Sequence, residues 1–217
     1  MQKVSGQEYC FSSGPREVDY YVREPVNGIN SNTGLMLLLH NWGGIWKQTE
    51  PWCDILADEY NLITVSVNYL QSGETRHEQV PYDHGLLQAM DCLRAVHQIR
   101  QQLLQAEINW NEHRLYAAGG SGGGNVSLML NKLAPASFAA IVDMCGMPGL
   151  TTDIAFGRGH LNAGYSNDPL SPKFLSPAMQ EIRDPGHLAH LKQQKSVNPN
   201  NKVVIVHGQD DQACSVT

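Results

Sequence analysis

The 217-residue sequence has few charged side chains, 17% of the total, and no run of charge of one sign. It carries 15 Lys and Arg against 21 Asp and Glu, which gives a formal net charge of -6 at pH 7. Because nucleic-acid-binding proteins meet phosphates with a basic face, this balance argues against a nucleic-acid partner. The sequence also lacks an apolar stretch of about 18 residues that could span a bilayer and an apolar signal-peptide core. We therefore expect a cytoplasmic protein with no membrane partner.

Cysteine and histidine lack the spacing that metal sites use. The cysteines are odd in number and scattered, with no Cys-x-x-Cys pair: Cys10, Cys53, Cys92, Cys145 and Cys214. Such cysteines are typical of small buried side chains in a reducing compartment rather than of a disulfide or zinc framework. The nine histidines contain no His-x-x-x-His pair on an expected helix. We therefore predict no metal site and no cofactor.

The hydrophobic content of 41% over 217 residues is enough to bury one substantial core. Nothing in the chain resembles a linker, so we expect a single domain over residues 1–217. Residues 146–201 are rich in Gly, Pro, Asn and His and lack periodic apolar residues. We expect them to form an insertion, or cap, between the sixth and seventh strands.

Alternating strands and helices make up the rest of the chain. Apolar runs predict strands at 34–40, 62–69, 115–118, 138–144 and 202–207, after two short strands within 8–22 that flank a turn at 12–15. Apolar residues spaced by three or four predict helices at 50–60, 86–103 (capped by Asp83) and 125–133, with short ones at 177–182 and 186–192. This order predicts an α/β fold with a mostly parallel sheet and helices on both faces.

The segment RLYAAGGSGGGN, residues 114–125, is the most informative stretch of the sequence. It places Ser121 on a sharp turn between an expected strand and an expected helix. Such a turn requires backbone angles that a β-carbon penalises, which explains Gly119 and Gly123 on either side. A phosphate-binding loop is the weaker interpretation, because no lysine follows the glycines as a Walker A loop requires. A flexible turn without chemistry is the remaining alternative.

Polar clusters follow three of the expected strands, at 40–44, 119–125 and 207–211. In parallel sheets the chemistry gathers at the carboxyl ends of the strands. With these clusters in this order, the chain resembles an α/β-hydrolase from about Gly34 to Asp211. The resemblance implies an α/β-hydrolase fold in which Ser121 is the nucleophile of a serine hydrolase.

The resemblance also assigns the oxyanion hole, the pair of N–H groups that stabilises the charged intermediate. The sequence HNWGG, residues 40–44, is similar to the family's His-Gly-x-Gly loop, with Asn41 where the family usually has glycine. Asparagine tolerates left-handed backbone angles, so this departure is mild. When the family's roles are assigned to the matching positions, the resemblance implies that Trp42 and Gly122 supply the two N–H groups, with Gly43 as the alternative to Trp42.

A serine hydrolase also needs an acid and a base to complete its catalytic triad, and the sequence identifies these two residues less fully. HGQDD resembles the segment after the seventh strand, where the family's acid lies four residues beyond the histidine, which implies Asp211. Asp210 and Asp143 are the alternatives. The family's catalytic histidine follows an eighth strand, which this sequence does not show. We expect His207 and His40 to be structural and the chain to be C-terminally incomplete, although a histidine of the insertion is an alternative base.

The substrate class rests on weaker signals. Trp42, Trp46 and Trp52 lie on or just after the oxyanion loop, where they are candidates to line an acyl or sugar pocket or to pack in the core. The Gly-Gly-Ser-x-Gly-Gly elbow is similar to that of prolyl-oligopeptidase-type enzymes and of bacterial acetyl esterases acting on carbohydrates. We predict a carboxylic ester hydrolase with a small-molecule substrate. The alternatives are a non-catalytic binding protein or inactive fragment of this fold, and a small serine peptidase; the sequence does not define the oligomeric state.

Overall fold

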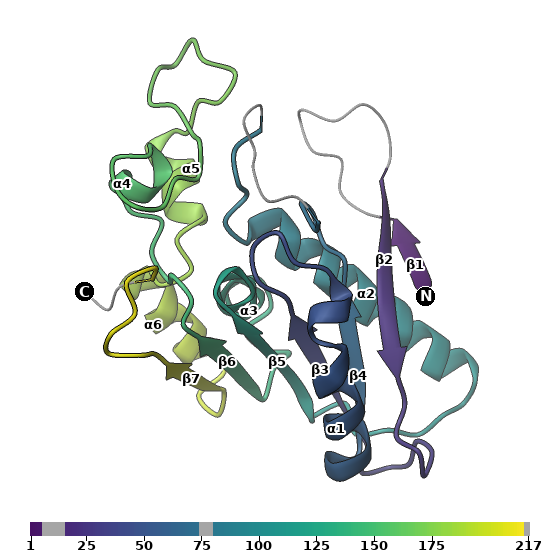
Figure 1. Ribbon diagram of the computed structural model, residues 1–217. Helices are drawn as coiled ribbons and strands as arrows, with labels where there is room; N and C mark the ends of the chain where they lie inside the picture. Colours follow the sequence, from purple (N-terminus) through teal and green to yellow (C-terminus); the bar gives the residue numbers. More distant parts are fainter. Residues whose placement is uncertain (6–15, 74–79, 215–217) are drawn as a thin grey trace.

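The computed structural model of the chain describes residues 1–5, 16–73 and 80–214. Seven strands form one sheet in the order β1-β2-β4-β3-β5-β6-β7 (Figure 1). The strands are β1 (Gln2–Ser5), β2 (Glu17–Arg23), β3 (Gly34–Leu39), β4 (Leu62–Val67), β5 (Leu115–Gly120), β6 (Ala140–Met144) and β7 (Lys202–Val206). β1 pairs with β2, and β2 with β4, in antiparallel fashion, whereas all pairs from β4 to β7 are parallel.

The sheet is covered on both faces because its strands alternate their side chains with a period of two. Leu35 and Leu37 of β3 pack into the larger core with helices α2 (Leu86–Gln105) and α3 (Gly122–Leu133). Leu38, the next residue along β3, packs on the opposite face with Cys53 of helix α1 (Glu50–Tyr60). The short 3-10 helix η1 (Trp46–Gln48) leads into α1. The expected mostly parallel sheet with helices on both faces is confirmed.

The 146–201 segment contains three short helices, α4 (Thr152–Ala155), α5 (Pro177–Ile182) and α6 (Leu188–Val197). Figure 1 shows α4 and α5 above the upper edge of the sheet and α6 beside α3. An amide hydrogen bond joins α6 to α3, because Nδ2 of Asn131 donates to Oε1 of Gln194 at 2.5 Å. The segment is therefore tied to α3, the helix that directly follows Ser121.

Most element predictions are confirmed, and the differences have local causes. α3 begins at Gly122 rather than Asn125, because the buried glycines pack against the sheet and this packing overrides their low helix propensity. β1 at Gln2–Ser5 was not predicted, β2 corresponds to the second strand expected within 8–22, and the expected strand before the turn and the turn at 12–15 lie outside the described residues. α6 covers 188–197 instead of 186–192, because Asp184, Pro185 and Gly186 form a turn. α4 is too short to leave a periodic signal.

β7 forms one edge of the sheet, and its apolar side chains remain exposed. Four consecutive apolar residues at 203–206 are between 39% and 58% exposed. Exposed apolar edge strands are templates for pairing with a further strand. Among the described residues, no helix has the length and apolar character needed to cross a membrane.

Candidate active site

Ser121 lies between β5 and α3 in a strained backbone conformation. It is the residue before the first turn of α3 and has φ 52° and ψ −120°. A non-glycine residue with positive φ persists only where surrounding contacts hold it, and such residues concentrate at functional sites. Here the N–H of Ser121 donates to the carbonyl of Met144 at 2.8 Å, and its carbonyl accepts from the N–H of Gly124 at 2.9 Å. These bonds fix the turn between β5 and α3 and attach it to the end of β6.

Two glycines permit this turn because a methyl group would not fit at either position. A β-carbon on Gly119 would lie 2.3 Å from the carbonyl group of Gly123. A β-carbon on Gly123 would lie 2.4 Å from the carbonyl oxygen of Leu39 and 2.6 Å from that of His40. The elbow therefore packs backbone against backbone, at the carboxyl ends of β3 and β5.

The backbones of Trp42 and Gly122 are adjacent beside Ser121. A β-carbon on Gly122 would lie 2.8 Å from the backbone nitrogen of Trp42. Gly122 is the first residue of α3, where N–H groups have no partner within the helix and the helix dipole favours negative charge. Gly43 has φ +73° and belongs to the tight turn in which the N–H of Gly44 donates to the carbonyl of Asn41. The backbones of Trp42 and Gly122 thus lie side by side next to Ser121, whereas Gly43 shapes the turn.

Tyr82, which no sequence motif indicated, holds the Trp42 side chain. The two rings stack with centroids 4.1 Å apart and planes 18° apart. A β-carbon on Gly122 would lie 2.7 Å from the Tyr82 hydroxyl. The N–H of Tyr82 donates to the carbonyl of Ala163 at 2.7 Å. Tyr82 and Trp42 therefore form an apolar wall together with the 146–201 segment, whose contributions are Leu150, Ile154, Ala155, Phe156, Ala163, Tyr165 and Leu175.

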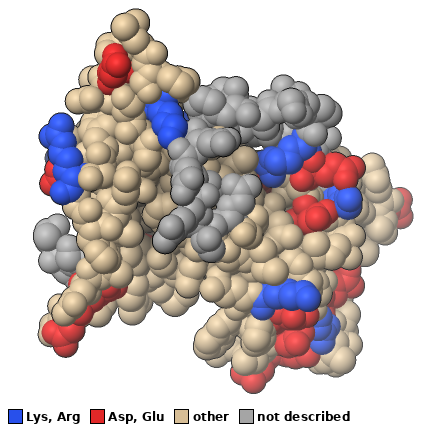
Figure 2. All heavy atoms as spheres, turned by 45° about the horizontal axis from the view of Figure 1, so that its top comes forward, with Lys and Arg blue, Asp and Glu red and all other residues tan. Residues whose placement is uncertain are grey.

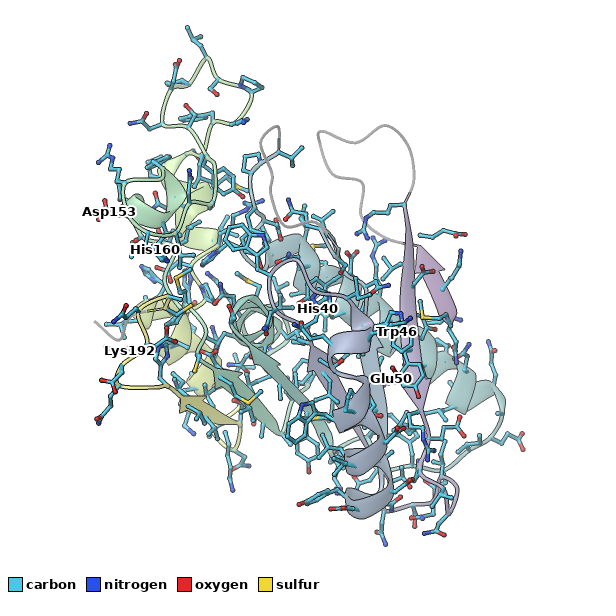
Figure 3. The ribbon with its side chains drawn as sticks, in the orientation of Figure 1. His40, Trp46, Glu50, Asp153, His160 and Lys192 are labelled. Carbon is cyan, nitrogen blue, oxygen red and sulfur yellow. The ribbon has the colours of Figure 1, made fainter. Side chains whose placement is uncertain are left out.

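His40 is buried at the carboxyl end of β3 and has a structural role (Figure 3). Its Nδ1 contacts the carbonyl of Asn41 at 2.8 Å, and its Nε2 contacts the hydroxyl of Ser72 at 2.7 Å. The ring stacks on Tyr69 at 4.0 Å, and the Tyr69 hydroxyl donates to the His40 carbonyl. Burial lowers the pKa of His40 to about 4, so the ring is neutral at physiological pH. Both nitrogens are engaged in holding the oxyanion loop.

Asp211 lies in the loop after β7 with its carboxylate held by the backbone. Oδ1 accepts hydrogen bonds from the N–H groups of Ala213 and Cys214, each at 2.9 Å. Oδ2 is 3.5 Å from Nε2 of His207. The Cys214 N–H bond is the largest influence lowering the pKa of Asp211, supported by the Ala213 N–H and by His207. Asp211 is thus ionised at neutral pH. Its neighbour Asp210 is exposed.

The loop that carries Asp211 reaches the nucleophile through Cys214. Burial raises the pKa of the Cys214 thiol, and a side-chain hydrogen bond with Ser121 partly opposes this rise. Because the Cys214 N–H also binds Asp211, the two candidate catalytic residues are linked through one intervening residue. His207 completes the loop by contacting the Cys214 carbonyl through Nε2. His207 thus has a structural role in the loop, as we expected from the sequence.

Asp143, the alternative acid near the end of β6, is buried against the first turn of α3. It is fully buried, and Oδ1 accepts from the N–H of Gly146 at 2.9 Å. A β-carbon on Gly124 would lie 1.9 Å from Oδ1. Burial raises the pKa of Asp143, which disfavours the ionised form that a triad acid needs.

No histidine among residues 1–5, 16–73 and 80–214 is hydrogen-bonded to Ser121. His160 is exposed and lies near α4 in the 146–201 segment (Figure 3). His187 and His190 lie with Glu181 in a separate cluster at the junction of α5 and α6. Sequence reasoning overlooked this cluster because it considered His-x-x-x-His spacing, whereas His187 and His190 are three residues apart.

Of the three tryptophans that were candidates to line a pocket or to pack in the core, only Trp42 lies beside Ser121. Trp46 stacks on Tyr21 of β2 with ring centroids 4.8 Å apart. Trp52 is 60% exposed on α1. The three tryptophans therefore do not form one pocket.

Comparison of the sequence finds no matching family model and no matching curated protein. Solved structures do match over almost the whole chain. Acylaminoacyl peptidase from Pyrococcus horikoshii has a TM-score of 0.65 at 16% identity, covering 99% of this chain and 32% of the peptidase. Esterase 2 from Thermogutta terrifontis has a TM-score of 0.54 at 12% identity, covering 95% of this chain and 81% of the esterase. An arylesterase has a TM-score of 0.54 at 17% identity, covering 95% of this chain and 76% of the arylesterase.

These matches and the strand order show that the chain has the α/β-hydrolase fold. The chain spans about a third of the length of the peptidase that it matches.

Proposed function

We propose that this α/β-hydrolase-fold chain is a serine hydrolase that cleaves carboxylic esters of small molecules. The observation that carries the proposal is the strained Ser121, held at the start of α3 with the backbones of Trp42 and Gly122 beside it. A loop that only connects two elements has no need for a strained serine surrounded by glycines. The solved structures that it resembles are named as esterases and a peptidase, which supports hydrolysis without naming the substrate.

In the proposed reaction the Ser121 hydroxyl attacks the carbonyl carbon of the ester while a histidine takes its proton. The N–H groups of Trp42 and Gly122 bind the oxyanion, and each such donor typically contributes about 10²- to 10³-fold in rate. The histidine returns the proton to the departing alcohol, which leaves an acyl group on Ser121. A water molecule, deprotonated by the same histidine, then attacks the acyl carbon, which releases the acid and restores the Ser121 hydroxyl. Asp211, ionised and backbone-bound, orients the histidine and stabilises its charged form.

We infer that the catalytic histidine comes from a segment that pairs with β7. A parallel strand there would cover the exposed apolar residues at 203–206. The carboxyl end of that strand would meet the same sheet edge as Ser121 and Asp211. The segment belongs either to the same polypeptide or to a second chain.

Ester substrates are favoured by the surface and by the apolar wall at the site. The half-buried Trp42, backed by the buried Tyr82, offers an apolar surface for an acyl group beside Ser121. On the face in Figure 2, charged side chains form small mixed groups separated by neutral surface, which suits an uncharged substrate. The chain also accounts for 81% and 76% of the two matched esterases.

A serine peptidase is the second candidate, favoured by the TM-score of 0.65 to the acylaminoacyl peptidase. The two activities separate in one assay with p-nitrophenyl esters and the matching N-acyl-amino-acid p-nitroanilides. Hydrolysis of the anilides at a kcat/KM similar to that of the esters would replace the ester proposal.

The proposal is tested by intact-mass spectrometry after incubation with a fluorophosphonate, with Ser121→Ala as the control. We expect one adduct on the wild-type protein and none on the variant. The 217-residue chain and the polypeptide that its natural gene encodes are tested together. Labelling of the latter alone would place the base outside the 217 residues. An unlabelled Ser121 in both versions would favour a non-catalytic binding protein.

A further inference from the structure

Three potential metal ligands converge at the corner between α5 and α6. Glu181 belongs to the last turn of α5, His187 immediately precedes α6, and His190 lies in the first turn of α6. One ligand atom from each residue lies within 4.8 Å of the other two. Oε1 of Glu181 is 3.1 Å from Nε2 of His190, and the two imidazole rings have centroids 4.5 Å apart. Residues three apart on a helix share one face, which explains why the two rings meet.

Each ring has a nitrogen for which the described chain provides no hydrogen bond. Nδ1 of His187 and Nδ1 of His190 are both buried atoms without a partner among the described residues. Buried polar atoms in native structures almost always have a partner, so Nδ1 of His187 calls for an explanation such as an ion. The side chains themselves are open enough for an ion to enter, because His190 is 22% and Glu181 52% exposed.

Hydrogen bonds from Lys132 and to Pro148 hold the corner between α5 and α6 in place. Nζ of Lys132, in α3, donates to the carbonyls of Glu181, Ile182 and Asp184 at 2.9, 2.8 and 2.9 Å. The N–H of Gly186 donates to the carbonyl of Pro148 at 2.7 Å. The turn from α5 to α6 is therefore fixed before any ligand binds, which a selective metal site requires.

The corner also contains the carboxyl group of Asp184, whose Oδ1 accepts from the N–H of Gly186 at 3.1 Å. Burial raises the pKa of Asp184, whereas the N–H of Gly186 and the nearby His187, Lys132 and His190 act in the opposite direction.

We propose that Glu181, His187 and His190 bind one divalent transition-metal ion, with Zn²⁺ the best match. Two imidazoles and a carboxylate are a donor set that zinc uses when a water completes a tetrahedral site. Ligand atoms about 2.0 Å from a tetrahedral ion lie roughly 3.3 Å apart, close to the 3.1 Å between Glu181 and His190. Mg²⁺ and Ca²⁺ are poorer matches because they prefer oxygen ligands.

The ion would clamp α5 to α6 and so stabilise the corner against α3. α6 is bonded to α3 through Gln194 and Asn131, and Lys132 of α3 holds the corner itself. Because α3 directly follows Ser121, the clamp fixes part of the 146–201 segment relative to the proposed nucleophile. Metal binding does not depend on the proposed hydrolase function, since none of the ligands contacts Ser121.

The test is calorimetric titration of the chelator-treated chain with ZnCl₂, and with MgCl₂ and CaCl₂ as comparison ions. We expect one Zn²⁺ per chain, no measurable Mg²⁺ or Ca²⁺ binding, and a higher thermal midpoint when Zn²⁺ is present. Glu181→Gln and His190→Ala should each weaken Zn²⁺ binding by at least about tenfold. His113→Ala removes an exposed histidine elsewhere and should leave binding unchanged.

Cobalt provides a second readout that does not depend on stability. Co²⁺ at a four-coordinate site gives intense visible absorption, which Glu181→Gln and His190→Ala should remove while far-UV circular dichroism confirms their folding. Zn²⁺ binding by His190→Ala with wild-type affinity would overturn the proposal. A folded wild-type chain that binds no Zn²⁺ would overturn it as well and would leave an ordinary Glu181–His190 ion pair.

Discussion

Arg183, just after α5, reaches the buried carboxylate of Asp83 across 100 positions of the sequence, with Nη2 3.4 Å from Oδ1. The other carboxylate oxygen of Asp83 accepts from the N–H groups of Leu87 and Gln88 in the first turn of α2. One carboxylate thus caps a core helix and holds the 146–201 segment. This pair and the Lys132 bonds tie the segment to two different helices of the core.

Asp83→Asn should destabilise the protein by about 3 kcal/mol, because removing one partner of a buried ion pair leaves the other charge buried without it. The free energy of unfolding in urea measures the effect. Glu112→Gln is the matched control, since Glu112 forms an exposed pair with Arg100 and such pairs contribute about 0–1 kcal/mol. Equal losses in both variants would show that the Asp83 charge is not coupled to Arg183.

Asp211→Asn should slow fluorophosphonate labelling and ester hydrolysis by about 10³- to 10⁴-fold in the active form of the protein, because the histidine loses its orienting carboxylate. Rates at saturating substrate measure the loss. Asp210→Asn changes the exposed neighbour and should leave the rate unchanged. The assignment fails if Asp210→Asn is the slower variant, or if Asp143→Asn lowers the rate without lowering stability.

The glycine pattern around Ser121 predicted the elbow, but for a different reason from the expected one, because neither Gly119 nor Gly123 has a positive φ. Both are needed where two strands and a helix approach too closely for a β-carbon. Local spacing did give α1 its observed bounds, since apolar periodicity reports which side of a helix is buried.

Contacts between distant segments were not predictable in this way. The stack of Tyr82 on Trp42 joins two loops, neither of which has a periodic pattern. Likewise, Glu181 meets His190 only because the turn at 183–187 reverses the chain. Local spacing does not encode such a turn angle, which depends on bonds from Lys132 in another helix.

Gly123→Ala should cost about 3 kcal/mol or more, because the added carbon would overlap the carbonyl oxygens of Leu39 and His40, which are backbone atoms that cannot move aside. Thermal and urea unfolding measure the loss. Gly149→Ala is the control, since its β-carbon would meet only Thr151 Cγ2 at 3.8 Å. It should change stability by no more than about 0.5 kcal/mol. Similar stabilities of the two variants would contradict the close packing of the elbow.

The buried imidazole of His40 predicts a loss of stability in mild acid. Its pKa falls from 6.5 to about 4 on folding, so the unfolded chain takes up the proton first. The contribution is therefore fully present above pH 6.5 and is lost as the pH falls toward about 4. From about pH 7.5 to about pH 5 the expected loss is about 2 kcal/mol. Asp83 and Asp143, whose pKa values burial raises, act in the opposite direction.

The contribution of His40 is isolated by comparing the pH dependence of stability in the wild-type protein and in His40→Asn. Both proteins contain Asp83 and Asp143, so the effects of these carboxyl groups cancel. The free energy of unfolding is measured in urea from about pH 7.5 to about pH 5. The variant is expected to be less stable at neutral pH, because it loses the stack on Tyr69, but to lose about 2 kcal/mol less on acidification. His97→Asn, which replaces an exposed imidazole, should parallel the wild-type protein. If His40→Asn also parallels the wild type, His40 takes up its proton equally in both states and is not the neutral, buried support of the oxyanion loop.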